Sequence, residues 1–331
     1  MPIELLAIQS IPLEQIDEDR LTDFSLGPVP ESLQHSIREI GVTHPAILLS
    51  QGDRYRIVCG HRRARAARNL NETALPSRVL AGSWNTAARL TLNLQENFAH
   101  RQYSDIEKSL ILFKLTQAGV AEADLIRDTL PYLGLERSKK LAMDLQQAAT
   151  LPPRLQQLLH DLNVPLRVLA CLLRWDETSR EATADLLETL RPGVNKIREI
   201  LELTDDTARR DRLNPHEILN RQEIQSILND PQRPPHEKYD AVHQQLHQWR
   251  HPHLSDLQLQ VRSALEKLKL DNAIKFRVPE NFENEKFRIE LRFSNREQLQ
   301  TQAEQLFRIS DSKTLAELLS LFNPRKSKDQ A

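Results

Sequence analysis

The distribution of glycine constrains the fold of this 331-residue chain more than any other feature, since only eight glycines are present. Five of them precede residue 83, and none follows Gly193. Glycine permits tight turns and a close approach of ligand to backbone because it has no Cβ. We therefore expect the turn-rich, ligand-binding part of the chain in about the first eighty residues. The remainder is expected to be mostly helical.

The composition indicates a folded chain with more than one domain. Hydrophobic residues make up 39% and charged residues 27%, and 331 residues exceed the usual span of one core, so two or three domains are expected. Two cysteines, Cys59 and Cys171, favour a reducing cytoplasm over a disulfide scaffold. No apolar run approaches 18 residues, so neither a signal peptide nor a membrane span is expected. The net charge of -1 means that any DNA binding must come from local basic patches.

The first 98 residues predict a mixed α/β domain. Leu33, Ile37 and Ile40 follow helical spacing and Gly41 stands at the C-terminal cap, which predicts a helix over residues 31–40. The other predicted elements are an edge strand over 10–16, a hairpin of strands 46–49 and 55–59, a helix that begins after Gly60, and a strand around 78–80.

Three short stretches within this part carry chemistry-bearing residues. The first is Glu39-Ile40-Gly41-Val42-Thr43-His44-Pro45-Ala46-Ile47-Leu48. The second is the basic stretch Gly60-His61-Arg62-Arg63-Ala64-Arg65-Ala66-Ala67. The third is Asn93-Leu94-Gln95-Glu96-Asn97-Phe98-Ala99-His100-Arg101, with Ile106-Glu107 after it. An arginine- and alanine-rich helix alone is typical of a solvated surface, so the three stretches gain meaning only together.

In order and spacing these stretches resemble the motifs of the ParB/sulfiredoxin superfamily, and residues 8–205 resemble the ParB family itself. The resemblance implies an α+β ParB/sulfiredoxin-like N-terminal domain that binds CTP with Mg²⁺ and acts as a clamp-closing switch on DNA. His44 replaces the family's usual Gln and His61 its usual acidic residue. The sequence therefore predicts CTP binding and leaves open whether a weak CTP hydrolysis accompanies it.

The resemblance implies a nucleotide-binding site made of eight residues. Gly60 would allow a phosphate near the backbone, at the N-terminus of the following helix. Arg62 and Arg63 offer guanidinium groups that match phosphate oxygens, and Glu96 and Asn97 offer oxygen ligands for Mg²⁺. The full expected nucleotide site is Thr43, His44, Gly60, His61, Arg62, Arg63, Glu96 and Asn97, with Glu96 and Asn97 as the metal ligands.

From residue 99 the pattern predicts an all-α central domain with a helix-turn-helix. Ser104-Asp105-Ile106-Glu107 is a capping box, a second helix covers about 122–130, and a third covers 136–149 after the turn at Gly134. The third helix is the expected recognition helix, with Arg137, Ser138, Lys139 and Lys140 contacting DNA near its N-terminus. A plain helical hairpin of a bundle is the alternative interpretation of this local sequence.

The last part of the chain predicts a small α/β domain. Apolar residues alternate over 274–278 and again over 287–293, which predicts two half-buried strands, and Ser294-Asn295-Arg296-Glu297 predicts the start of a helix with Leu299, Ala303 and Leu306 inward. Two strands are marginal alone, so we expect a dimerisation domain completed by a partner subunit. The expected domains are 1–98 (nucleotide-binding), 99–210 (helix-turn-helix), 211–256 (connector) and 257–325 (dimerisation).

The resemblance implies a cytoplasmic, nucleoid- or plasmid-associated homodimer that binds a centromere-like site on double-stranded DNA. A ParA-type ATPase is the family's further partner, and only about nine residues precede the expected fold to contact it. Two other functions stay open. One is a small-molecule kinase or sulfiredoxin-type enzyme, although Gly60 separates Cys59 from the basic stretch. The other is a KorB-like transcriptional repressor, which genome position beside a ParA-like gene would distinguish from a partition protein.

Overall fold

We analysed a computed structural model of the chain, which describes residues 5–98, 101–268, 270–271, 273–278 and 287–322. The chain divides into two compact units, residues 1–245 and 246–331. The first unit contains a mixed α/β domain followed by a mostly helical region. The second contains a small two-stranded sheet with helices. Among the described residues, no helix is long and apolar enough to cross a bilayer.

A five-stranded mixed sheet forms the centre of the N-terminal domain. Its strands, in chain order, are β1 (Gln9–Pro12), β2 (Ile16–Asp17), β3 (Ala46–Gln51), β4 (Arg54–Cys59) and β5 (Ala74–Val79). In space the order is β1-β5-β3-β4-β2. β3 pairs antiparallel with β4, as expected for the hairpin, and parallel with β5, so the helix between β4 and β5 must cross over the sheet.

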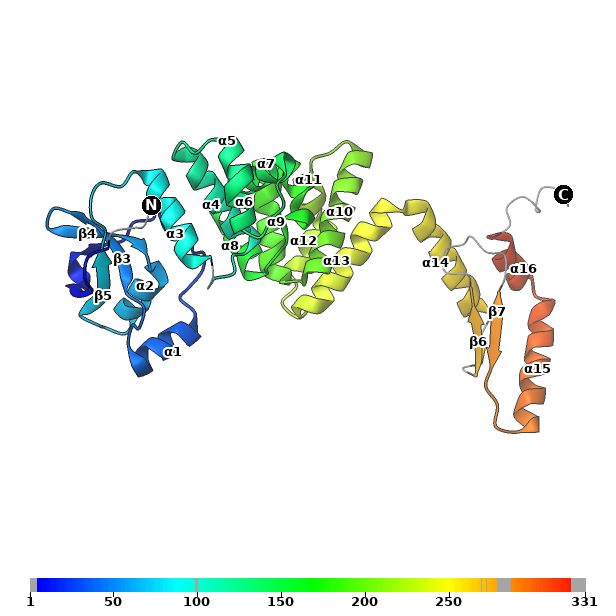
Figure 1. Cartoon of the computed structure of the whole chain (residues 1–331). Coiled ribbons are helices and arrows are strands. Elements are labelled where there is room, and N and C mark those ends of the chain that lie inside the picture. Colours follow the sequence, from blue (N-terminus) through cyan, green and yellow to red (C-terminus); the bar gives the residue numbers. More distant parts are fainter. Residues whose placement is uncertain (1–4, 99–100, 269, 272, 279–286, 323–331) are drawn as a thin grey trace. The chain divides into compact units, whose positions relative to one another are not determined.

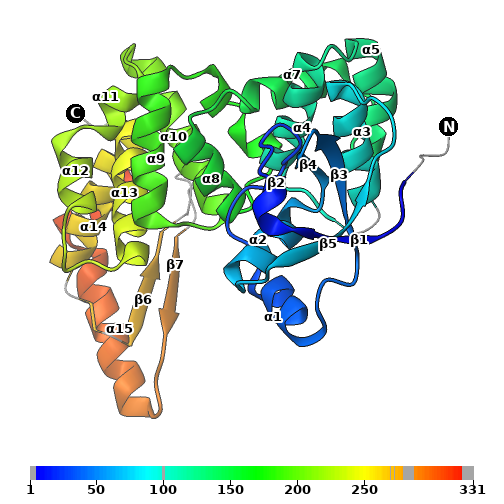
Figure 2. The ribbon, with the colours of Figure 1, turned by 90° about the vertical axis from the view of Figure 1, so that its left-hand side faces the viewer.

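Helices cover both faces of this sheet (Figure 2). On one face, α2 (His61–Asn69) buries Ala64 and Ala67 against strand residues such as Leu48, and α1 (Glu31–Ile40) packs beside it. On the other face, α3 (Thr86–Asn97) buries Leu92 with Val58 and Cys59. The small alanine side chains let α2 approach the sheet closely.

The helix α3 also ties the sheet to the helical region. Leu90 and Leu94 lie on its other side, in a large core shared with α4 and the helices that follow, and both are at most 2% exposed. Full burial of one leucine side chain contributes roughly 1.5–3 kcal/mol. Because one helix contributes to both cores, residues 1–98 and the helices after them form one packed unit rather than two loosely linked ones.

The helical region contains a run of short helices. These are α4 (Asp105–Gln117), α5 (Glu122–Asp124), a π-helical turn (Leu125–Thr129), α6 (Leu130–Tyr132), α7 (Lys139–Ala148), α8 (Pro153–Asp161), 3₁₀ turns (Leu166–Leu169 and Leu172–Arg174), α9 (Glu177–Leu190), α10 (Val194–Asp211), α11 (Pro215–Leu219), α12 (Gln222–Leu228) and α13 (Pro235–Arg250). The expected capping box is confirmed, since Glu107 N donates to Ser104 Oγ and the Glu107 carboxylate accepts from Ser104 N.

The segment expected as a connector, residues 211–256, is largely helical. It holds α11 and α12, all of α13 and the start of α14 (Pro252–Lys267). The boundary between the two compact units falls inside α13, after Gln245. The Pro-rich stretch 231–235 separates α12 from α13, and its last proline is the first residue of α13, a position at which proline fits a helix well.

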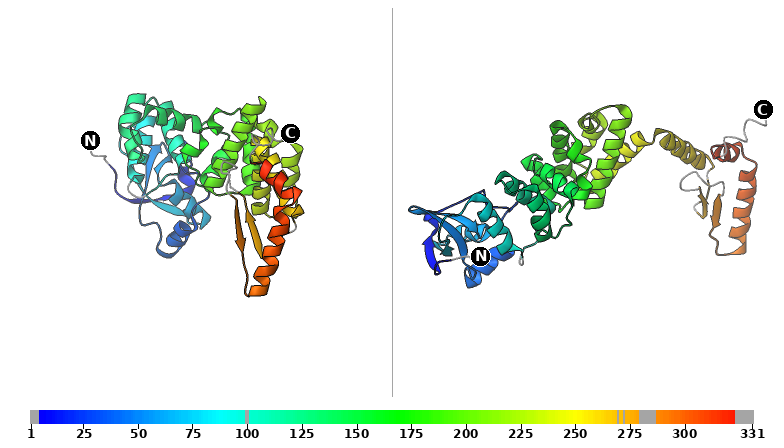
Figure 3. Two further views of the ribbon diagram at one scale, coloured as in Figure 1. Left: turned by 90° about the vertical axis from the view of Figure 1, so that its right-hand side faces the viewer. Right: turned by 45° about the horizontal axis from the view of Figure 1, so that its top comes forward.

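The second unit contains α14, β6 (Ile274–Arg277), β7 (Arg288–Leu291), α15 (Arg296–Ser310) and α16 (Lys313–Ser320). β6 and β7 pair antiparallel, with Phe276 opposite Ile289, and the hairpin runs alongside α15 (Figure 3). A small core joins Val261 and Ala264 of α14 to Ile309 and Leu318. Residues 269, 272, 279–286 and 323–325 of the expected dimerisation domain lie outside the described residues.

The prediction that Leu299, Ala303 and Leu306 of α15 point inward is wrong. Leu299 and Ala303 are exposed and Leu306 is half-buried. The cap is also shifted by one residue, because Asn295 Oδ1, not Ser294, accepts from Gln298 N at 2.8 Å. Phe307 on the same helix is 75% exposed. The small unit therefore presents apolar side chains that its own core does not cover.

Candidate nucleotide-binding site

The start of α2 determines the shape of the site. Gly60 has φ of +100°, a conformation that L side chains rarely adopt, and a Cβ there would lie 3.1 Å from Ala46 Cβ. This tight turn brings β4 directly into α2, so that the first turn of the helix opens beside β3. The close approach of Gly60 to Ala46 places the loop before β3, which carries Thr43 and His44, next to the helix start.

Arg63 joins the three motifs. Its Nη1 donates to the His44 carbonyl oxygen at 2.7 Å and to the Pro45 carbonyl oxygen at 3.0 Å. Its Nη2 pairs with Glu96 Oε1 at 3.0 Å, from the last turn of α3. Thr43 Oγ1 lies 3.2 Å from His44 Nδ1. One guanidinium group thus links the loop before β3, the start of α2 and the end of α3.

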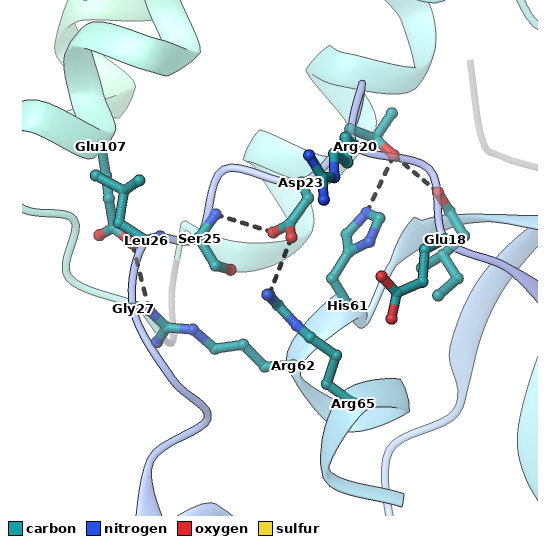
Figure 4. A network of polar contacts seen from close by, with 12 residues as sticks. Glu18, Arg20, Asp23, Ser25, Leu26, Gly27, His61, Arg62, Arg65 and Glu107 are labelled. Atoms are coloured by element: carbon teal, nitrogen blue, oxygen red, sulfur yellow. Dashed lines mark hydrogen bonds and ion pairs between the residues drawn. The ribbon is translucent and has the colours of Figure 1, made fainter. Parts of the chain in front are cut away.

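A second ion-pair cluster surrounds Arg62. Glu107, which is 1% exposed, places Oε1 3.3 Å from Arg62 Nη2 (Figure 4). The same Oε1 lies 2.5 Å from Arg101 Nη2. Burial, and next the charge of Arg101, lowers the pKa of Arg62, which as a guanidinium still stays charged. The Nε atoms of Arg62 and Arg101 are buried and have no hydrogen-bond partner among the described residues.

These groups surround a cavity of about 470 Å³. Seven of the eight predicted nucleotide-site residues line it, namely His44, Gly60, His61, Arg62, Arg63, Glu96 and Asn97. Thr43 does not line the cavity, but its hydroxyl group lies within hydrogen-bonding distance of His44, which does. The cavity also has lining residues that the sequence analysis did not select, namely Asp23, Phe24, Ser25, Leu33, Asn93 and Arg101.

The loop before α1 supplies the unexpected wall. Ser25 N donates to Asp23 Oδ1 at 2.9 Å, and Asp23 pairs with Arg65 at 2.9 Å (Figure 4). Asn93 on α3 holds this loop by donating to the Thr22 carbonyl oxygen. No periodic pattern or motif covers residues 18–30, so this loop carried no signal. Arg101 belongs to the third motif but was not predicted as a site residue, because its ion pair with Glu107 cannot be seen from the sequence.

His61 lines the cavity but is a buried part of its wall. It is 8% exposed, and its Nε2 lies 3.0 Å from Thr22 Oγ1, which donates to the Ile57 carbonyl oxygen. Burial lowers the pKa of His61 to about 4, so the ring is neutral near pH 7. A neutral, hydrogen-bonded imidazole contributes no charge to phosphate binding, in contrast to the neighbouring arginines.

Glu96 and Asn97, the predicted Mg²⁺ ligands, both line the cavity. The side-chain Nδ2 of Asn97 donates to the Asn93 carbonyl oxygen at 2.9 Å. This hydrogen bond does not use the side-chain oxygen of Asn97, which is the atom that would bind a metal. The described residues contain no cluster of three or more His, Cys, Asp or Glu side chains that could hold a metal alone. Mg²⁺ is commonly held by one or two protein oxygens together with phosphates and water, so the donor set fits that mode.

The expected recognition helix begins later than predicted. Instead of Glu136, the first helical residue is Lys139, because Ser138 is the N-cap and its Oγ accepts from Leu141 N at 3.2 Å. Arg137 precedes the helix and donates to the Arg127 carbonyl oxygen at 3.1 Å, whereas Lys139 lies 3.7 Å from Glu122. Lys140 is exposed and forms no ion pair within the described part of the chain.

The packing of α7 leaves one face outward. Ala142, Leu145 and Ala148 are buried, and the helix packs against α4. Lys140 and Met143 point away from that core, and Met143 is 57% exposed. The helices before α7, from Glu122 to Tyr132, form a single run with a π-helical turn in its middle. Two helices joined by the turn at Gly134 are therefore present, as the sequence predicted.

Cys59 is buried at the end of β4 and is a free thiol. Burial, with a smaller effect of the Glu96 carboxylate, raises the pKa of this thiol well above its usual range. A thiol of this kind is a poor nucleophile, because the thiolate is the reactive form. The side chain acts as part of the core between β4 and α3.

A glycine turn thus leads from a mixed sheet into an arginine-bearing helix, beside a cavity lined by arginines. Residues 3–98 match the model of the ParB N-terminal domain and belong to that family. The predicted family assignment of this domain is confirmed. Ala99 and His100, the end of the third motif, lie outside the described residues.

Several curated proteins are distant relatives of the chain. The probable chromosome-partitioning protein ParB of Pseudomonas putida is 29% identical over 161 residues, covering 46% of this chain and 51% of that protein. The Coxiella burnetii protein of the same name is 33% identical over 118 residues (34% and 37%), and the probable plasmid-partitioning protein ParB of Thermus thermophilus is 30% identical over 144 residues (44% and 42%). The chain thus spans about half, or less, of the length of these relatives.

Two solved structures of C-terminally truncated ParB from Caulobacter crescentus were also found. The complex with CTP-gamma-S is 21% identical, has a TM-score of 0.25, and covers 54% of this chain and 92% of that one. The complex with the centromeric parS site is 17% identical, has a TM-score of 0.33, and covers 59% and 98%.

Proposed function

We propose that this chain is a ParB-like partition protein that binds a centromere-like DNA site and uses CTP with Mg²⁺ to close as a clamp on DNA. The observation that carries the proposal is the convergence of three separate motifs on one arginine-lined cavity. Relatives named chromosome- or plasmid-partitioning proteins support the cellular role. The membership of residues 3–98 in the ParB N-terminal domain family supports the nucleotide.

The proposed division of labour assigns the nucleotide to the cavity. Arg62, Arg63 and Arg101 bind phosphate oxygens, and the N-terminus of α2 at Gly60 presents backbone N–H groups. Glu96 and Asn97 take part in Mg²⁺ binding, which neutralises the triphosphate charge when the metal is present. We make no assignment of a catalytic residue, because the neutral, buried His61 occupies the position where the family has an acidic side chain.

DNA binding is assigned to α7 and the residues just before it. Ser138 sits at the cap, Arg137 and Lys139 flank it, and Lys140 is an exposed cation of the first turn, so phosphates and base edges would be contacted from the N-terminal turn. Acidic side chains lie close by, since Lys139 faces Glu122 and Arg127 pairs with Asp124 and Asp128. Contact with base edges must therefore carry more of the affinity than a general positive field.

We assign dimerisation to the second unit. Phe293, Leu299 and Phe307 are large apolar side chains at least 36% exposed, on or beside α15. A second copy of the chain would cover them and extend a sheet too small to be stable alone. Phe307→Glu should convert the dimer to monomer in sedimentation experiments, whereas Arg308→Glu on the same helix should not. A wild-type monomer at micromolar concentration contradicts this assignment.

A sulfiredoxin-type activity is disfavoured by the state of Cys59. The thiol is fully buried and its pKa is raised, whereas such chemistry requires an accessible thiolate. Selection of DNA sequences bound by the full chain, with and without CTP and Mg²⁺, tests the main proposal. We expect one enriched DNA site. We also expect CTP to change how long the protein is retained on closed circular DNA that carries this site. Absence of any enriched sequence contradicts it, and location of the site in promoters alone favours the KorB-like alternative.

A further inference from the structure

We propose that Glu107 is an internal counter-anion of the cavity, which holds Arg62 and Arg101 while the site is empty and releases them to the phosphates of a ligand. This inference rests on the proposed function and names how that site is regulated. Glu107 does not line the cavity, and it contacts the ligand only through the two arginines. It is a positioning residue in this account.

The charges around Glu107 do not balance. A single carboxylate, 2% exposed, faces two guanidinium groups whose side chains are 27% and 13% exposed. By contrast, Arg63 has its own partner in Glu96, and Arg65 has Asp23. One excess positive charge therefore remains at the cavity wall, and the buried Nε atoms of Arg62 and Arg101 offer hydrogen bonds that no described residue accepts.

An anionic ligand must compete with Glu107 for these arginines. Charge-assisted bonds from a guanidinium to phosphate are as favourable as those to a carboxylate, and a triphosphate carries several oxygens. Partial burial strengthens both interactions, because it excludes water from the charges. The carboxylate therefore lowers the affinity of the site for anions, and it keeps the arginines folded into the wall when no ligand is present.

The same carboxylate controls the start of α4. Its Oε1 accepts from Leu26 N at 3.3 Å, and its Oε2 accepts from Ser104 N at 3.2 Å. Ser104 Oγ in turn shares a hydrogen bond of 2.8 Å with His160 Nδ1 on α8. A change in the ion pairs of Arg62 and Arg101 with Glu107 would thus alter the hydrogen bonds at the N-terminus of α4. Through Ser104 and His160 it would also reach α8 in the helical region.

Charge removal without loss of the cap tests the idea. Glu107→Gln keeps an oxygen that can accept from Ser104 N, since glutamine also serves in a capping box, but it removes the negative charge. The matched control is Glu217→Gln, because Glu217 closes the capping box of α11 by accepting from Asn214 N at 2.7 Å and does not line the cavity.

The measurements are the affinity for CTP with Mg²⁺ by calorimetry and the melting temperature with and without the nucleotide, on the full chain. We expect Glu107→Gln to melt lower than wild type without nucleotide, yet to bind CTP about threefold to tenfold more tightly, the size of one partly screened charge interaction. Glu217→Gln should bind CTP as wild type does. The double variant Glu107→Gln/Arg101→Gln should lose the gain in affinity, since it again carries a single excess positive charge, as wild type does.

The outcomes separate the two proposals. If wild type binds no CTP, the proposed function fails. If wild type binds CTP and Glu107→Gln binds it equally or more weakly, the counter-anion role is wrong while the proposed function stands. If both capping-box variants gain affinity alike, the effect comes from general loosening of the fold, and the inference is also overturned.

Discussion

Arg63 and Glu96 form an ion pair of 3.0 Å that joins the start of α2 to the last turn of α3. The two side chains are 17% and 30% exposed, so the pair is partly shielded from water. It holds together residues more than thirty positions apart in the sequence, and both belong to motifs that the sequence analysis selected. The pair therefore connects the part of the candidate site proposed to bind phosphate with the part proposed to bind Mg²⁺.

The first prediction concerns this pair. Arg63→Ala and Glu96→Ala should each lower the affinity for CTP at least about tenfold, because a charge-assisted bond contributes roughly 1.5–3 kcal/mol. Each should abolish CTP-dependent clamp closure, measured by cross-linking between subunits, while leaving specific DNA binding nearly intact. Arg54→Ala is the control, since Arg54 pairs with Asp17 at an exposed position outside the cavity. Loss of site-specific DNA binding in either test variant contradicts the division of labour.

The second prediction concerns the turn into α2. Gly60→Ala should destabilise the protein by about 2–4 kcal/mol and remove CTP binding, because the alanine is strained at φ +100° and its Cβ meets Ala46. Gly52→Ala has a similar positive φ, but a Cβ there meets nothing within 4 Å, so about 1 kcal/mol is expected. Denaturant unfolding measures both. Equal losses for the two variants show that the contact with Ala46 is unimportant.

Sequence reasoning found this turn because the information is local. A glycine between a β-rich run and an alanine-rich run predicts a strand, a turn and a helix in that order, and the structure confirms it with β4, Gly60 and α2. The hairpin and the helix from Glu31 to Ile40 followed in the same way from spacing and turn residues. The eight nucleotide-site residues were predicted from the family resemblance, and seven of them line one cavity.

The rest of the site depends on contacts that local patterns do not encode. Asp23 and Phe24 lie in a loop without periodicity, and Asn93 on α3 places that loop at the cavity. His61 was predicted as a nucleotide-site residue, and the pairing with Thr22, 39 positions away, makes it a buried part of the cavity wall. The start of α7 was ambiguous, since Glu136 is a good helix former and only the Ser138 cap decides the boundary.

The third prediction concerns pH. Burial lowers the pKa of His61 to about 4 from 6.5, so between these values the unfolded chain binds a proton that the folded chain does not. Its contribution to stability is complete above pH 6.5 and is lost as the pH falls toward 4, by up to about 3 kcal/mol. Urea unfolding across this range should show a smaller decline for His61→Asn than for wild type. If the free energy of unfolding falls with pH in parallel for the two proteins, His61 is not the cause of the loss of stability.

The fourth prediction concerns DNA. Lys140→Ala should weaken binding to all DNA sequences by a similar factor and reduce the slope of log affinity against log salt by about 1, because one phosphate contact is lost. Lys313→Ala, an exposed lysine at the start of α16, is the control. Fluorescence anisotropy at several salt concentrations gives both slopes. An unchanged slope for Lys140→Ala means that α7 does not contact the DNA backbone there.

Titration of the full chain with CTP and Mg²⁺, compared with ATP and repeated with the selected DNA site present, tests the central claim most directly. The account predicts binding of CTP that the DNA site strengthens, and its loss in Arg63→Ala. No affinity for CTP, either with or without DNA, would contradict the proposal that this chain is a nucleotide-dependent DNA clamp.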